Sequence, residues 1–214
     1  MNNKYKLLLF DLDGTLCDTD EMIVQTMFSI YKDYRPTKER TREELYYFSG
    51  PPIRETLKRE FPNYDADEMY EVFKRVSRSF YKDTVVPYKD EIEVLTKLKD
   101  RGYLLGVVTN KGLPLTIYSL ELCHIDHLFD VVISADDVKI PKPNPEGVEL
   151  AMKRLNIVDK KSILYIGDND IDDETAKNSK VNSLLVTWGP RTINRLKSAN
   201  YLAKSYQELG EILL

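Results

Sequence analysis

Two aspartates separated by a single residue, Asp11 and Asp13, stand at the end of a short apolar run and just before Gly14. Side chains two residues apart in an extended chain point to the same side, and glycine permits a sharp turn after them. A second acidic group, including Asp168 and Asp172, follows a later apolar run. Crowded carboxylates repel one another unless a divalent cation lies among them, and oxygen-only ligands favour Mg²⁺. The pattern therefore indicates a Mg²⁺ site, provided that the two runs are neighbouring strands.

The second acidic group has two other interpretations. Asp168, Asp170 and Asp172 occupy the first, third and fifth positions of a calcium-binding EF-hand loop. Asp173 replaces the glycine and Ser179 the final glutamate that this loop requires, so calcium sensing is not expected. Aspartates before a helix also cap its free N–H groups. Capping remains an equal alternative for Asp170 or Asp173, and only a minor one for the first pair of aspartates.

Two further segments carry polar side chains that could bind a phosphate or an anion. Thr109 and Asn110 end one run, where a hydroxyl group and successive main-chain N–H groups near a helix start would bind a phosphate. A simple turn stabilised by the Thr109 hydroxyl explains the same residues. Lys142 lies between Pro141 and Pro143, which restrict its direction, and a solvated loop charge is the alternative.

These polar residues need a framework that brings strand ends together. Short apolar runs rich in β-branched and aliphatic residues predict five buried strands: Lys6 to Phe10, Leu104 to Thr109, Val131 to Ser134, Ser162 to Gly167 and Leu184 to Thr187. Helix-periodic stretches lie between them: Glu91 to Arg101, Leu115 to Cys123, Glu146 to Leu155 and Asp172 to Ser179. The alternation predicts an α/β fold with a parallel sheet covered on both faces. Ligands of such sheets bind at the carboxyl ends of the strands.

One interval interrupts this alternation. Residues 17–87 contain no strand-like run and show helical periodicity in two places, with Met22 and Ile30 in the first and Phe73 in the second. We interpret the interval as a helical insertion. The expected division is a core of residues 1–16 and 88–214 and an inserted domain of residues 17–87.

The composition limits the partners and the compartment. The chain has 214 residues, with 31 Lys and Arg against 35 Asp and Glu, so no overall positive field attracts nucleic acid or an anionic membrane. No apolar run approaches the roughly 20 residues of a membrane span, and Met1 to Tyr5 lead into a strand rather than a signal peptide. Cys17 and Cys123 lack CxxC spacing and are expected to be free thiols. We expect a cytoplasmic protein, either a monomer or a weak homodimer.

Together these segments resemble the haloacid dehalogenase-like (HAD) hydrolases, whose signatures are DxDGTxxD, a strand ending in Thr or Ser, a Lys in a KPxP context, and GDxxxD. The chain carries them in the family order as Asp11-Leu12-Asp13-Gly14-Thr15-Leu16-Cys17-Asp18, Val108-Thr109-Asn110, Lys142-Pro143-Asn144-Pro145 and Gly167-Asp168 to Asp172. The resemblance implies a Rossmann-like core with strand order 5-4-1-2-3, and it identifies the insertion as the family's small mobile cap.

The resemblance also implies the catalytic roles. Asp11 would attack phosphorus to give an aspartyl phosphate, and Asp13 would protonate the leaving oxygen and then take a proton from water. Mg²⁺ would be held by the Asp11 carboxylate, the Asp13 main-chain carbonyl group and Asp168.

Further residues would bind the substrate or orient the site. Thr109 and the N–H group of Asn110 would bind the phosphoryl oxygens, and Lys142 would span them and the nucleophile. Asp172 would orient the metal shell or Lys142 rather than bind the ion directly.

Two further segments indicate which branch of the family the chain resembles. Gly50 to Leu57 is similar to the cap loop of phosphoglycolate-phosphatase-like members, and the tail Thr187 to Leu209 resembles their ending. Arg54 in that loop would reach a substrate carboxylate or a second phosphate, and a solvated helix charge is an equal alternative.

The expected function is therefore a Mg²⁺-dependent phosphatase acting on a small phosphorylated metabolite such as phosphoglycolate. Inorganic pyrophosphate is a further candidate substrate. A phosphosugar mutase shares the same core but needs a cap that excludes water. A metal-free dehalogenase would not be expected to keep Asp13 with the Mg²⁺ acids. A catalytically silent binding protein is disfavoured because every residue that the chemistry needs is present.

Overall fold

The central strand β1 (Leu7–Phe10) consists of four apolar residues that are completely buried. The computed structural model describes residues 4–191, 193–194 and 196–214, and among these β1 pairs in parallel with β4 (Leu104–Val108) and β6 (Ile163–Gly167). The sheet is completed by β5 (Val131–Ile133), β7 (Asn182–Val186) and β8 (Tyr201–Ala203). The strand order is β5-β4-β1-β6-β7-β8. Parallel strands buried on both faces read as continuous apolar runs, which explains why the sequence reveals them.

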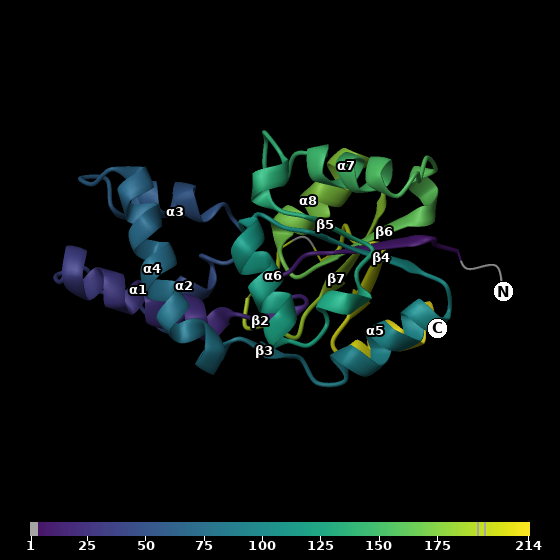
Figure 1. Ribbon diagram of the computed structural model, residues 1–214, viewed down its shortest axis with the longest axis horizontal. Coiled ribbons are helices and arrows are strands. Elements are labelled where there is room, and N and C mark those ends of the chain that lie inside the picture. Colours follow the sequence, from purple (N-terminus) through teal and green to yellow (C-terminus); the bar gives the residue numbers. More distant parts are fainter. Residues whose placement is uncertain (1–3, 192, 195) are drawn as a thin grey trace.

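Helices cover both faces of this sheet (Figure 1). Leu7 and Leu9 belong to the hydrophobic cluster on the face of α7 (Glu146–Arg154) and α8 (Asp170–Ser179), whereas Leu8 and Phe10 belong to the cluster on the opposite face. That opposite face is covered by α5 (Glu91–Asp100), α6 (Leu113–Leu122) and α9 (Tyr206–Leu213). The alternating side chains of one strand thus bury both faces of the sheet.

The direction of winding changes at β1. The chain passes from β1 to β4 and β5 on one side and then crosses to β6 and β7 on the other. Phe10 at the end of β1 lies in register with Val107 of β4 and Ile166 of β6. The residues that follow these strands therefore meet at one edge of the sheet, which is where ligands bind in open α/β folds.

The interval between β1 and β4 begins and ends in a small antiparallel ladder. β2 (Cys17–Asp18) pairs with β3 (Val86–Pro87). Between them lie the helices α1 (Asp20–Tyr34), α2 (Arg42–Tyr46), α3 (Ile53–Glu60) and α4 (Ala66–Thr84). Figure 1 shows these four helices gathered to one side of the sheet and its covering helices.

The predicted fold class and the order of the five predicted strands are confirmed. The structure adds β8 at one edge, and it corrects the expectation that residues 17–87 contain no strand, because β2 and β3 stand at the two ends of that interval. Cys17 and Cys123 are free, with their Sγ atoms 3.1 Å apart. Within the described part of the chain, no helix is long and apolar enough to cross a membrane. Of the segment from Met1 to Tyr5, on which the expectation of no signal peptide rests, residues 1–3 lie outside the described residues.

Candidate active site

The carboxyl ends of β1 and β6 bring three aspartates together. Asp11 follows β1, Asp168 follows β6, and Asp172 lies in the first turn of α8. One carboxylate oxygen from each lies within 4.8 Å of the other two, and all three residues are buried. The structure thus unites carboxylates that the sequence analysis expects at neighbouring strand ends.

Lys142 lies among these carboxylates. Its Nζ atom is 2.7 Å from Asp11 Oδ1 and 2.8 Å from Asp172 Oδ1, and its side chain is only 3% exposed. Asn110 holds the lysine main chain, because its Oδ1 accepts from the Lys142 N–H group at 2.8 Å and its Nδ2 donates to the Lys142 carbonyl group at 3.3 Å. Lys142 is therefore a buried ion-pair partner and not a solvated loop charge.

Burial and charge act against each other on these groups. Burial raises the pKa of Asp11 to about 7 although the Lys142 ammonium opposes the rise. It also raises the pKa of Asp168 to about 6 against the opposing charge of Arg191. Burial alone would lower the pKa of Lys142, but Asp11 and Asp172 hold it well above its usual range. A divalent cation would compensate the desolvated carboxylates and favour their ionised form.

The donor atoms of the cluster fit a hard divalent cation. Asp11 Oδ2 is buried and accepts no hydrogen bond from any residue that the structure describes. A buried carboxylate oxygen without a partner is costly, so a metal or a water molecule is its expected ligand. Asp172 differs, because its Oδ1 accepts from Lys142 and its Oδ2 accepts from the Asn169 N–H group at 3.0 Å. Asp11 Oδ2 thus offers an unpartnered oxygen donor, and Asp168 Oδ1 accepts only a long hydrogen bond from Thr15 Oγ1 at 3.3 Å, whereas both oxygens of Asp172 are occupied.

Arg191 is a buried partner of Asp168 to which the sequence analysis assigns no role. Its Nε donates to Asp168 Oδ2 at 2.8 Å, and its Nη2 binds the same oxygen. Its Nη1 binds the Asp20 carboxylate and donates to the Tyr46 carbonyl group at 3.3 Å. A Cβ atom at Gly14, where φ is +85°, would overlap the guanidinium group, so glycine leaves the space for it. No local pattern signals this arginine, because its partners are distant in the sequence.

Asp13 carries a second ion pair. Its Oδ1 accepts a hydrogen bond from Thr19 Oγ1 at 2.7 Å and pairs with Lys111 Nζ. Lys111 has a side chain that is 10% exposed, and its Nζ lies 5.4 Å from the centre of the Tyr81 ring. No role is expected for Lys111 from the sequence, although its place directly after Asn110 is the signal that would find it.

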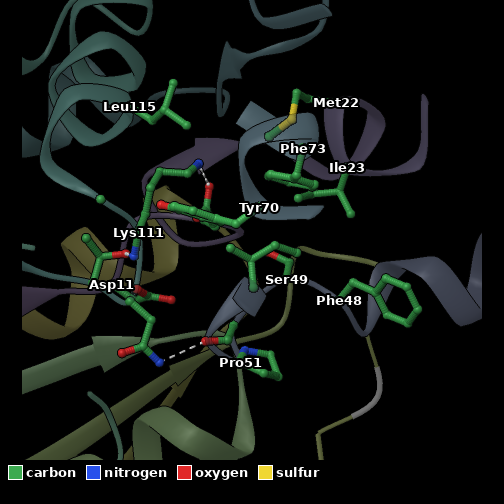
Figure 2. Close-up of a pocket in the computed structure, with 16 residues that line it drawn as sticks. Asp11, Met22, Ile23, Phe48, Ser49, Pro51, Tyr70, Phe73, Lys111 and Leu115 are labelled. Carbon is green, nitrogen blue, oxygen red and sulfur yellow. Dashed lines mark hydrogen bonds and ion pairs between the residues drawn. The ribbon is translucent and has the colours of Figure 1, made fainter. Parts of the chain in front are cut away.

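A pocket beside these residues has one polar and one apolar wall. The charged and amide side chains follow β1 and β4, and the apolar side chains come from α1, α4, the starts of α3 and α6 and the segment between α2 and α3. Figure 2 shows Lys111 and Asp11 on one side and Met22, Ile23 and Phe73 on the other. The lining residues are Asp11, Asp13, Met22, Ile23, Phe48, Ser49, Gly50, Pro51, Ile53, Tyr70, Phe73, Thr109, Asn110, Lys111, Gly112 and Leu115.

The remaining predicted residues lie in or near this pocket. Thr109 and Asn110 line it, and Thr109 Oγ1 also accepts from the Lys111 N–H group at 3.2 Å, as in a simple turn. Arg54 is not among the lining residues. Its half-exposed side chain pairs with Asp67 and lies 4.0 Å from the centre of the Tyr70 ring, which does line the pocket.

Comparison with known proteins relates this geometry to a family. The sequence profile of the haloacid dehalogenase-like hydrolases matches residues 8–186. The chain is a haloacid dehalogenase-like hydrolase. In this hydrolase the matched residues run from β1 to β7 and include each strand end that carries one of the clustered aspartates.

Individual relatives extend over most of the hydrolase. A pyrophosphatase PpaX of Listeria monocytogenes serotype 4b is 36% identical over 188 residues, which cover 88% of this chain and 86% of the relative. A pyrophosphatase PpaX of Bacillus velezensis is 36% identical over 211 residues, covering 96% and 94%. The crystal structure of a predicted phosphoglycolate phosphatase from Haemophilus somnus matches with a TM-score of 0.86 at 22% identity, over 100% of both chains. The last likeness shows that the two proteins share a fold.

Proposed function

We propose that this haloacid dehalogenase-like phosphatase depends on Mg²⁺ and works through an aspartyl phosphate formed on Asp11. The state of the Asp11 carboxylate carries the proposal. Lys142 holds its Oδ1 at 2.7 Å, and its buried Oδ2 accepts no hydrogen bond from the described residues. A fixed, desolvated carboxylate beside a buried ammonium group suits nucleophilic attack on a phosphoryl group.

Hydrolysis then divides into two displacements. An Asp11 oxygen forms a bond to phosphorus while the bond from phosphorus to the leaving oxygen breaks, and Asp13 donates the proton that the leaving oxygen takes. In the second displacement Asp13 accepts a proton from water as the water oxygen attacks phosphorus. The bond from phosphorus to Asp11 breaks, and the carboxylate is regenerated as phosphate leaves.

The surrounding groups compensate charge on the transferred phosphoryl group. Mg²⁺ bound by the Asp11 carboxylate, the Asp13 main-chain carbonyl group and Asp168 would neutralise part of that charge. Thr109 Oγ1 and the Asn110 N–H group bind phosphoryl oxygens in this proposal.

Two groups complete the catalytic arrangement. Lys142 contacts both the phosphoryl group and Asp11 in our proposal. Asp172 is a positioning residue, supported by its 2.8 Å contact with the Lys142 ammonium group.

We assign substrate selection to residues 17–87 as a cap over a core of residues 1–16 and 88–214. In support, the pocket takes apolar side chains such as Met22 and Phe73 from this interval and Asp11 and Thr109 from the core. We also propose that Arg54 binds a substrate carboxylate or a second phosphate, for which it would need to leave Asp67.

The substrate is a phosphorylated small molecule, and we propose phosphoglycolate or a similar metabolite. Inorganic pyrophosphate is the second candidate, because the curated relatives described above are named pyrophosphatases. Lys111 in the pocket supports either choice, since both compounds carry a second anionic group that its ammonium group would bind on leaving Asp13.

The test is phosphate release with Mg²⁺ from a panel of phosphoglycolate, pyrophosphate, sugar phosphates and nucleotides. We expect one preferred substrate, and Asp11→Asn should remove turnover while the far-ultraviolet circular dichroism stays that of the wild type. Wild-type activity in Asp11→Asn would contradict the proposed nucleophile. Isomerised sugar phosphate would favour the mutase. Halide release without metal would favour the dehalogenase, and Mg²⁺-dependent ligand binding without turnover would favour the silent binding protein.

We further propose a cytoplasmic location, a monomeric or weakly dimeric state, and no nucleic-acid or membrane partner. The formal net charge of −4 supports the absence of nucleic acid, and the free Cys17 and Cys123 thiols suit a reducing compartment. Sedimentation velocity checks the oligomeric state.

A further inference from the structure

Arg191 connects the carboxylate cluster with two helices of the interval 17–87. Its side chain is 2% exposed, and its guanidinium group binds Asp168 after β6 and Asp20 at the start of α1. The Tyr46 carbonyl group at the end of α2 accepts a further hydrogen bond at 3.3 Å. Since guanidinium stays protonated at any physiological pH, this is a permanent positive charge at the edge of the proposed metal site.

The net charge of the buried groups around Arg191 matches that of one divalent cation. Four buried aspartates pair here with two buried cations, and the pairs are Lys142 with Asp11 and Asp172, and Arg191 with Asp168 and Asp20. The carboxylates exceed the cations by two charges when all are ionised, and one divalent ion neutralises that excess. Without Arg191 the excess would be three charges, and the attraction for a divalent ion would increase.

The contacts of Arg191 with Asp168 use a single carboxylate oxygen. Nε and Nη2 both bind Oδ2, whereas Oδ1 accepts only a long hydrogen bond from Thr15 Oγ1 at 3.3 Å. The guanidinium group therefore fixes the carboxylate without occupying both of its oxygens. Oδ1 is the atom that this arrangement leaves for a cation.

We propose that Arg191 is a positioning residue that fixes Asp168 and lowers the affinity of the active site for Mg²⁺. The inference rests on the proposed function, in which Asp168 holds the ion. Arg191 compensates Asp168 and Asp20 in the metal-free protein, and its charge opposes that of an ion bound to the same carboxylate. It therefore stabilises the metal-free site at the expense of metal affinity.

The measurement is Mg²⁺ binding to the metal-free protein by isothermal titration calorimetry, together with thermal unfolding in chelator and in Mg²⁺. We expect Arg191→Met to bind Mg²⁺ about tenfold more tightly than the wild type, because a nearby positive charge is lost. In chelator, Arg191→Met should also have a lower melting temperature than the wild type, and its melting temperature should rise more than that of the wild type when Mg²⁺ is added. Arg191→Lys keeps the charge and should bind within about threefold of the wild type.

A second variant tests the inference even if Arg191→Met does not fold. Asp20→Asn leaves Asp168 as the one carboxylate on the guanidinium group, so Mg²⁺ binding should weaken by about tenfold. Arg154→Met removes the ion pair between Arg154 of α7 and Asp137, which follows β5, and is the matched control, with unchanged Mg²⁺ affinity expected.

The outcomes separate this inference from the proposed function. Equal or weaker Mg²⁺ binding by Arg191→Met would overturn the role of Arg191, as would equal losses of melting temperature with and without Mg²⁺. If the role of Arg191 is overturned in this way, the proposed metal site is still supported when the wild type binds Mg²⁺ and Asp168→Asn does not. No Mg²⁺ binding by the wild type would overturn both.

Discussion

At the scale of single residues, Glu91 is a buried carboxylate outside the proposed active site. It begins α5 and is 1% exposed, its Oε2 accepts from the Tyr88 N–H group at 3.0 Å, and its Oε1 accepts from the Tyr206 hydroxyl group at 3.2 Å. Burial raises its pKa from 4.5 to about 9, and the charge of the Cys123 thiolate form adds to the rise. Glu91 is therefore neutral in the folded protein at neutral pH.

This raised pKa predicts a pH-dependent stability. Between about pH 4.5 and 9 the folded chain keeps a proton on Glu91 that the unfolded chain has released, so the free energy of unfolding falls as the pH rises. Glu91→Gln lacks this titrating group. We therefore expect its free energy of unfolding, relative to that of the wild type, to increase by up to about 1.4 kcal/mol per pH unit across this range. Urea unfolding at several pH values measures it.

The exposed neighbour on the same helix is the control. Glu93, whose side chain is 65% exposed, pairs with Lys97, and Glu93→Gln should leave the pH dependence unchanged. Parallel pH profiles of the wild type and Glu91→Gln would contradict the prediction.

The predictability of the candidate site differs from residue to residue. Asp11 and Asp168 stand in recognisable patterns directly after apolar runs, and their burial follows from those strands. Lys142 stands in a recognisable proline-flanked pattern, but it lies in a loop, and its burial does not follow from a strand. Arg191 pairs with partners 23 and 171 positions away, and such pairing depends on tertiary packing that no local pattern contains. Lys111 is intermediate, because it adjoins a predicted segment but finds Asp13 only after the strands align.

At the scale of elements, α4 is held at its start by a single side chain. Asp65 precedes the helix, and its Oδ1 accepts from the N–H groups of Asp67 at 2.9 Å and Glu68 at 3.0 Å. The first N–H groups of a helix lack partners within the helix, so this cap satisfies two of them. The carboxylate also lies at the positive end of the helix dipole.

Loss of this cap should destabilise the protein without affecting catalysis. We expect Asp65→Ala to lower the free energy of unfolding by about 1 kcal/mol, and Asp65→Ser to recover most of it because serine also caps helices. Denaturant unfolding measures both variants, and kcat with the preferred substrate serves as the control. Equal stability of Asp65→Ala and the wild type would refute the contribution of the cap.

The elements that the sequence does not reveal are the short, partly exposed strands. β8 has three residues and only one of them, Ala203, is buried, while β2 and β3 have two residues each. Hydrophobic periodicity needs several residues to appear, so such strands carry no signal. The buried apolar strands carry a strong one, and their predicted ends lie within two residues of the observed ends.

At the scale of the whole molecule, the helices of residues 17–87 share a hydrophobic core with the sheet. One continuous cluster of buried side chains includes Leu57 of α3 and Met27 of α1 together with Phe10 of β1 and Leu209 of α9. Apolar contact between two parts of a chain couples their stabilities. We therefore expect the molecule to unfold as one cooperative unit.

The cooperativity is tested by creating one cavity among the helices of residues 17–87 and another among the helices that cover the sheet. Leu57→Ala and Leu209→Ala each remove a fully buried side chain and should cost about 2–5 kcal/mol. Trp188 fluorescence, which reports on the loop after β7, and far-ultraviolet circular dichroism should shift together in both variants. A Leu57→Ala variant that shifts the dichroism but leaves the Trp188 transition in place would show two separate units.

The ladder of β2 and β3 bears on how a chain of this kind changes over generations. Cys17 is paired with Pro87 and Asp18 with Val86, so the interval between them starts and ends at adjacent positions. A lineage can lengthen, shorten or replace that interval without altering the distance that the sheet must bridge. Under the proposed division, residues 17–87 would carry selectivity and the surrounding core the chemistry, so that the two would be inherited on separable stretches of sequence.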